Sequence, residues 1–86
     1  MIEVKVLQLI LSRHQGYSSG QSNVAYCYEN GIGVSVNKQE AFKYYQLSAD
    51  QGNALAQFNL GCCFRDGDGV AKSGEEAFKY FKLSAD

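Results

Sequence analysis

The stretch Gly31-Ile32-Gly33-Val34 returns 36 residues later as Gly67-Asp68-Gly69-Val70. Around it, 14 of the 28 positions in residues 23–50 are identical to their counterparts in residues 59–86. A repeat period of about 20–50 residues is the signature of a solenoid, in which each unit buries its apolar surface only against its neighbours. Such an array presents an extended surface and seldom a catalytic pocket. The sequence therefore favours a binding module over an enzyme.

The repeat also predicts how the chain divides. Residues 11–22 keep five of 12 identities against residues 47–58, whereas residues 1–10 keep none against their counterparts. The predicted units are residues 1–14, which hold only the second helix of a partial repeat, then a repeat over residues 15–50 and another over residues 51–86. On this interpretation the chain is a fragment of a longer array, and we expect self-association through its uncapped ends.

Apolar residues within each unit recur at helical spacing. Ala56, Leu60, Cys63 and Phe64 fall at positions i, i+4, i+7 and i+8, which form one stripe of an α-helix. A second stripe follows after a glycine-rich loop, so each unit is predicted to be an antiparallel helical hairpin. The other expected stripes are Ala77, Phe81, Ser84 and Ala85, then Gly20, Val24, Cys27 and Tyr28, which face Ala41, Tyr45, Ser48 and Ala49. The predicted fold class is all-α, an α-solenoid of antiparallel helical hairpins.

Four loop glycines are interpreted as structural turn residues. Gly31 and Gly67 are expected to end their helices with a positive φ, and Gly33 and Gly69 follow in the same loops. The pattern Asn30-Gly31-Ile32-Gly33 is similar to the start of a phosphate-binding loop. Such a loop follows a strand and opens a helix, whereas these glycines follow a predicted helix.

Charge and hydropathy argue against two classes of partner. Eight Lys and Arg residues balance nine Asp and Glu residues, and the two signs are interleaved. This distribution predicts neither a nucleic-acid-binding surface nor a polybasic membrane patch. No stretch approaches the roughly 20 consecutive apolar residues of a membrane span.

Cysteine, histidine and aspartate are placed unfavourably for metal or disulfide chemistry. The three cysteines, Cys27, Cys62 and Cys63, are an odd number, so we expect free thiols and a cytoplasmic location. His14 has no cysteine at ligand spacing. A calcium loop beginning at Asp66 would have alanine at position 12, where a bidentate acid is needed. The sequence therefore predicts no metal, no cofactor and no catalytic residue.

Motifs in both units resemble the Sel-1-like repeat, a relative of the tetratricopeptide repeat with a longer loop. The second unit has Leu60-Gly61-x-x-Phe64-x-x-Gly67-x-Gly69-Val70, then Ala77-x-x-Tyr80-Phe81-x-x-Ser84-Ala85. The first has Tyr28-x-x-Gly31-x-Gly33-Val34, then Ala41-x-x-Tyr44-Tyr45-x-x-Ser48-Ala49-x-x-Gly52. It departs from the family at Gly20, where alanine is usual, and at Ala25, where glycine is usual. The resemblance implies a non-catalytic adaptor or scaffold with a protein or peptide partner.

The resemblance also implies which surface binds the partner. In the tetratricopeptide arrangement, the side of the first helix that faces away from the core lines a concave groove. The groove residues carried over from this arrangement are Ser19, Ser22, Asn23, Tyr26, Glu29 and Asn30 in the first unit, and Leu55, Phe58, Asn59, Cys62, Arg65 and Asp66 in the second. The paired asparagines could hydrogen-bond a peptide backbone, and the aromatic residues could anchor it, although Phe58 and Leu55 could instead pack against the neighbouring unit.

Two other functions remain open on the sequence. The array could be the tail of a larger signalling enzyme, for example a kinase, whose catalytic domain lies outside these residues. It could also be a secreted repeat protein, which would require disulfides.

Overall fold

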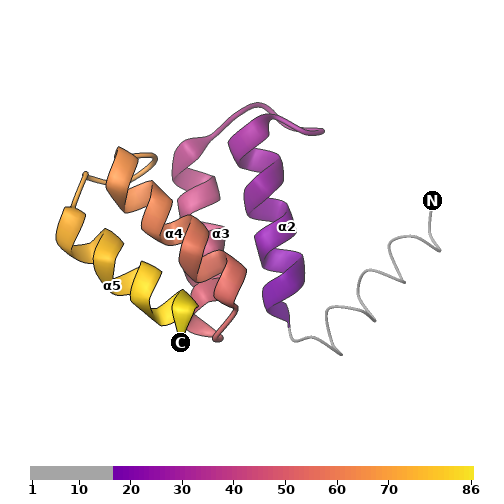
Figure 1. Ribbon diagram of the computed structural model, residues 1–86. Helices are drawn as coiled ribbons and strands as arrows, with labels where there is room; N and C mark the ends of the chain where they lie inside the picture. The colour runs from indigo at the N-terminus through magenta and orange to yellow at the C-terminus, as the bar shows by residue number, and fades with distance from the viewer. Residues whose placement is uncertain (1–16) are drawn as a thin grey trace.

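Four α-helices form the part of the chain that the computed structural model describes, residues 17–86. They are α2 (Tyr17–Asn30), α3 (Lys38–Asp50), α4 (Ala54–Asp66) and α5 (Gly74–Ala85). Helices α2 and α3 form one antiparallel hairpin, α4 and α5 form a second, and the hairpins stack through α3 and α4 (Figure 1). None of the four is long and apolar enough to cross a membrane. The predicted solenoid of helical hairpins is confirmed, and the predicted partial repeat over residues 1–14 lies outside the described residues.

Side-chain caps fix where the helices begin. Asn37 Oδ1 accepts a hydrogen bond from the backbone N–H of Glu40 at 3.1 Å, and Ser73 Oγ accepts one from Glu76 at 3.2 Å. Asn53 caps α4 in the same way. Each cap satisfies a backbone donor that has no partner inside its helix.

The two long loops have the same geometry. Their left-handed glycines are Gly31 (φ 68°), Gly33 (φ 75°), Gly67 (φ 73°) and Gly69 (φ 75°). The N–H of Asn37 donates to the carbonyl of Tyr28, and that of Ser73 donates to the carbonyl of Phe64, both at 2.8 Å. These values confirm the positive φ predicted at the helix ends. Glycine is favoured there because a residue with a Cβ rarely adopts this conformation.

Small and aromatic side chains fill the core. Tyr45 and Leu60 are the largest apolar side chains that are fully buried. Ser48 is also fully buried, and its hydroxyl donates to the carbonyl of Ser18 at 2.6 Å and lies 2.7 Å from Ser22 Oγ. These bonds satisfy the buried hydroxyls between α2 and α3.

The predicted core stripes hold best in α3 and α4 and less well at the two outer helices. Val24 is 38% exposed, although its repeat counterpart Leu60 is fully buried, and Ala85 is exposed. Ala25, outside the predicted stripe, is fully buried, and Cys27 is only half-buried. The reason is packing: among the described helices, α3 and α4 each pack on a hairpin partner and on one another, whereas α5 contacts only α4, and α2 contacts α4 much less than it contacts α3.

Candidate functional site

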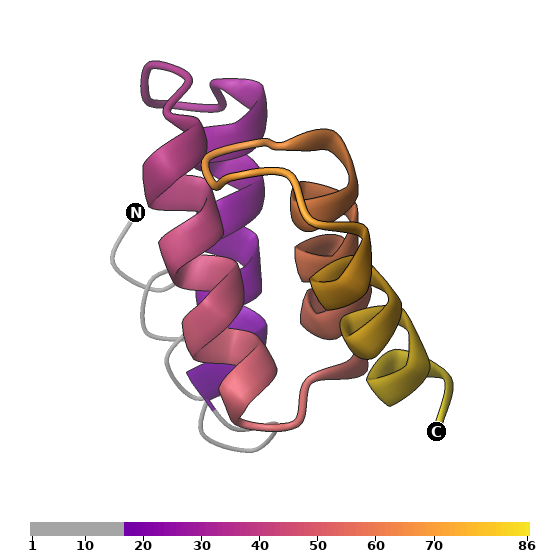
Figure 2. The same ribbon diagram turned by 90° about the vertical axis from the view of Figure 1, so that its left-hand side faces the viewer.

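Helices α2 and α4 lie on the inner side of the stack. Their Cα atoms approach within 8 Å, whereas no Cα pair of α3 and α5 does. A hydrogen bond of 3.3 Å from Asn53 Nδ2, just before α4, to Ser18 Oγ of α2 adds to this contact. Figure 2 shows α3 and α5 more widely separated. Because stacked hairpins diverge on the outside of a curve, the first helix of each hairpin lines the concave side.

An accessible stripe follows each of these first helices opposite the core. On α2, Asn23, Tyr26 and Asn30 are exposed and recur every three or four residues, as one helical face does. On α4, Asn59 and Cys62 are half-buried, and Leu55, Phe58 and Arg65 are exposed. We call the eight predicted partner-binding residues the inner face: Asn23, Tyr26, Asn30, Leu55, Phe58, Asn59, Cys62 and Arg65.

The inner face contains more apolar surface than its asparagines suggest. Leu55 is 64% exposed, Tyr26 54% and Phe58 48%. Phe58 also packs on Phe81 of α5, with ring centroids 5.5 Å apart and ring planes at 49°. Its ring is therefore fixed on one side and open to solvent on the other, which reduces the entropy cost of using it as an anchor.

A glycine makes this support possible. A Cβ added at Gly61, which is buried on α4, would lie 2.7 Å from the ring of Phe81. Only glycine lets that ring approach α4 closely enough to lie beneath Phe58. The repeat pattern places a glycine at position 61, but nothing in the sequence alone shows what packs against it.

The two asparagines are available for a ligand. Asn23 is exposed and Asn59 is half-buried, and within residues 17–86 neither side-chain amide makes a hydrogen bond. Asn30 differs, because its Nδ2 donates to the carbonyl of Tyr26 at 3.0 Å. The pair at repeat position 23/59 therefore presents donors and acceptors on adjacent helices.

Two of the residues predicted for the groove have structural partners instead. Ser22 is buried and hydrogen-bonded to Ser48, so its assignment to the groove is wrong. Glu29 is half-buried, and its Oε1 accepts a hydrogen bond from the hydroxyl of Tyr45 at 2.9 Å. Serine is small enough to pass between closely packed helices, which the helical spacing alone did not reveal. Ser19 is half-buried.

The link between Tyr45 and Glu29 was not predicted. Burial raises the pKa of the Tyr45 hydroxyl, and the hydrogen bond to the Glu29 carboxylate adds to the rise. In the second repeat the same two positions hold Phe81 and Arg65. The two positions change together between the repeats, a signal that a comparison of the units could have found.

At the second of these positions, Arg65 pairs with its own neighbour on α4. Its Nε lies 3.0 Å from Asp66 Oδ1, and both side chains are about half exposed. The charges of this pair compensate each other, so one end of the inner face carries little net charge.

The three cysteines are unpaired, as the sequence predicts, and the two on α4 are poorly reactive. Burial raises the pKa of the Cys63 thiol to about 12, and the Glu29 carboxylate contributes to the rise. Burial also raises the pKa of the Cys62 thiol, despite the opposing effect of Arg65. Both thiols are protonated at neutral pH, and a protonated thiol is a poor nucleophile and metal ligand. No group of His, Cys, Asp and Glu residues within the described part of the chain is arranged to hold a metal ion.

The two hairpins correspond to the units of a known repeat family. A model of the Sel1 repeat matches residues 18–53 and 54–86. The chain belongs to the Sel1 repeat family. The family model begins each repeat three residues later than the predicted units 15–50 and 51–86. Sel1 repeats generally mediate protein–protein interactions and are typically non-catalytic scaffolds.

Two solved structures show the same arrangement. A Sel1 repeat protein from Oxalobacter formigenes is 38% identical, with a TM-score of 0.78 over 79% of this chain. The protective antigen c5321 of uropathogenic Escherichia coli, which has the Sel1-like repeat fold, is 31% identical, with a TM-score of 0.80 over 86% of this chain. The chain spans only 28% and 16% of their lengths. No curated protein matches the sequence.

Proposed function

We propose that the inner face binds an extended peptide segment of a protein partner. The observation that carries this proposal is the pair Asn23 and Asn59, accessible on adjacent helices and without side-chain hydrogen bonds in the described residues. A carboxamide can donate to a backbone carbonyl and accept from a backbone N–H. Two of them at one repeat position can therefore hold two successive points of an extended chain.

The remaining surface of the inner face indicates the character of the peptide. Tyr26 and Phe58 lie on the same faces as the asparagines and offer aromatic surface of the kind that anchors interfaces. The Arg65–Asp66 pair compensates its own charge. We therefore infer a segment with apolar or aromatic side chains and low net charge.

In this function the chain acts as an adaptor or scaffold and carries out no chemistry itself. The protonated Cys62 and Cys63 support this proposal, because they are the residues on α4 with nucleophilic potential. The alternative of an enzyme-linked tail depends on residues outside this chain. The alternative of a secreted array would require disulfides, whereas Cys27, Cys62 and Cys63 are unpaired.

The test compares peptide binding by the wild-type chain and by the double variant Asn23→Ala/Asn59→Ala. Peptides selected on the wild-type chain from a random linear library serve as ligands, and their affinities are measured by fluorescence anisotropy. We expect the double variant to bind more weakly by roughly 1–3 kcal/mol, since peptide amides would lose their partners. Its unfolding free energy should change by less than about 0.5 kcal/mol, because neither side chain bonds within the described fold.

The matched control is Gln39→Ala, an exposed amide on α3, away from the inner face. It should bind the selected peptides as the wild type does. If the double variant binds as tightly as the wild type, the inner face is not the site. The loop segments 35–38 and 71–74, which differ most between the repeats, then become the candidates.

A further inference from the structure

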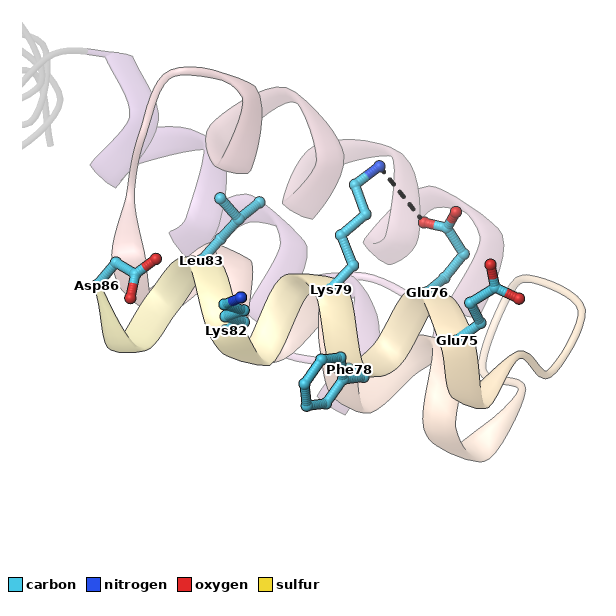
Figure 3. Close-up of a pocket in the computed structure, with 7 residues that line it drawn as sticks. All are labelled: Glu75, Glu76, Phe78, Lys79, Lys82, Leu83 and Asp86. Atoms are coloured by element: carbon cyan, nitrogen blue, oxygen red, sulfur yellow. Dashed lines mark ion pairs between the residues drawn. The ribbon is translucent and has the colours of Figure 1, made fainter.

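Helix α5 repeats the apolar positions of α3, but no described residue covers Phe78 on its outward side. Phe42 of α3 packs edge-on against Phe64 of α4, with ring centroids 5.4 Å apart and ring planes at 87°. Phe78 holds the same repeat position on α5 and is 68% exposed. Leu83, on the same helix, is 45% exposed, but its counterpart Leu47 of α3 is also 40% exposed, so the contrast between the two helices rests on Phe78. A shallow pocket is formed by Phe78, Leu83 and their charged neighbours (Figure 3).

Helix α2 has the complementary surface, which no residue of the described range 17–86 covers. It corresponds to α4, the helix that packs on α3. Its Val24 is 38% exposed, whereas the α4 counterpart Leu60 is fully buried. In the loop that follows, Val34 is 42% exposed, whereas its counterpart Val70 packs against the core. The outward faces of α2 and α5 are therefore the two halves of the contact that α4 and α3 already make.

The loops show the same relation. A Cβ at Gly69 would overlap the backbone carbonyl of Lys38, so this loop packs directly on the first turn of α3. The counterparts of these two residues are Gly33 and Gly74. Neither has any atom within 4 Å of the position that a Cβ would occupy. Both sides of the loop contact are present again, and no residue of the described range covers either.

We propose that the chain associates head to tail, with α2 and its following loop packing on α5 of a second copy. The arrangement is the one that α4 and its loop adopt on α3 within one chain. Phe78 would then meet Tyr28 of the second copy, as Phe42 meets Phe64. The surface is distinct from the inner face, and the inference does not depend on the proposed peptide binding.

The polar groups at this contact are compatible with it. Gln46 Nε2 of α3 donates to the hydroxyl of Tyr80 at 3.4 Å, and the corresponding pair between copies is Lys82 with the hydroxyl of Tyr44. A lysine can make the same donation. Within one chain, residues of α4 and its following loop pack on α3. Their counterparts on α2 and its following loop carry no charge: Gly20, Gln21, Val24, Tyr28 and Val34. Lys79 and Lys82 therefore meet no like charge on that surface.

A contact of this kind joins two different surfaces, which gives a specific test. Phe78→Glu removes the α5 surface and leaves α2 intact, whereas Val24→Glu does the reverse. Sedimentation velocity of the full chain across a concentration series should show the wild type growing into dimers and larger species. Each variant alone should need about tenfold more protein, or greater, to associate. An equal mixture of the two should form dimers and nothing larger, because only one intact contact remains.

The control is Leu47→Glu, which places the same charge at an exposed position of α3, where α2 and α4 already pack. It should associate as the wild type does. Phe78→Ala and Val24→Ala repeat the comparison with helix-favouring residues, should either glutamate variant lose its helical circular dichroism. The inference is overturned by a wild-type chain that stays monomeric up to millimolar concentration. Undiminished association of the Val24 variants, or loss of association in Leu47→Glu, would also overturn it.

Discussion

Gly33 and Gly69 share a repeat position and the same φ of 75°, yet their surroundings differ. The loop that contains Gly69 reaches over to the beginning of α3 (Figure 2), where its backbone packs on the carbonyl of Lys38. Around Gly33 the corresponding space is open. Glycine is therefore required at position 33 for its positive φ alone. At position 69 it is also required because a Cβ would overlap the backbone of α3.

We expect Gly69→Ala to destabilise the chain more than Gly33→Ala. Both variants incur the left-handed cost of about 1–2 kcal/mol for a residue with a Cβ. Gly69→Ala must also displace the backbone of α3, which adds roughly 1–3 kcal/mol, as overpacking typically does. Urea denaturation of the two variants at low protein concentration measures the difference. Equal losses would show that the loop does not pack rigidly on α3.

At the scale of elements, α3 is held to α2 by polar links that the second hairpin lacks. Tyr45 donates to Glu29, and Ser48 bonds to Ser18 and Ser22. In α4 and α5 the corresponding contact is the apolar one between Phe58 and Phe81. The two hairpins therefore share a backbone arrangement but use different interactions to maintain it.

The buried hydroxyl of Tyr45 makes the first hairpin sensitive to alkaline pH. Its pKa is raised in the folded state, mainly by burial, so the unfolded chain releases this proton first as the pH rises. The contribution of Tyr45 to the free energy of unfolding is therefore fully present below about pH 10, and it falls as the pH rises beyond that value. We expect Tyr45→Phe to reduce stability by about 1 kcal/mol at pH 7, through the lost hydrogen bond.

The same variant should lose less stability than the wild type between pH 9 and pH 11, because the titrating group is gone. Denaturant titrations of both chains at several pH values give the comparison. The contribution of Cys63 is present in both chains and cancels. Parallel losses in the two chains would show that Tyr45 does not titrate on unfolding.

The hairpins were predictable from the sequence because their signals are local and repeated. Helical spacing and the glycines at positions 31 and 67 suffice to predict two helices and the turn between them. The exposure of Val24 and the burial of Ser22 were not predictable in this way, because both depend on which helices pack nearby. The residues of the inner face were predicted from the resemblance to the tetratricopeptide arrangement. The contact between Phe58 and Phe81 was not predictable, because it depends on how α5 lies on α4.

At the scale of the whole molecule, α4 is the central element. It contacts α3, α5 and α2, and it supplies Leu60 and Cys63 to the core and five residues to the inner face. The proposed binding surface and the core are thus opposite sides of one helix. A substitution on the accessible side of α4 can alter binding while the core side keeps the hairpins together.

The order of these contacts along the chain has a consequence for the rate of folding. Among residues 17–86, the helices in contact are consecutive ones, together with α2 and α4, and α2 does not reach α5. Chains dominated by such local contacts fold in microseconds to milliseconds, and a chain without proline has no slow prolyl isomerisation. Stopped-flow refolding at low protein concentration should therefore finish within about 10 ms. A dominant phase lasting seconds would contradict this expectation.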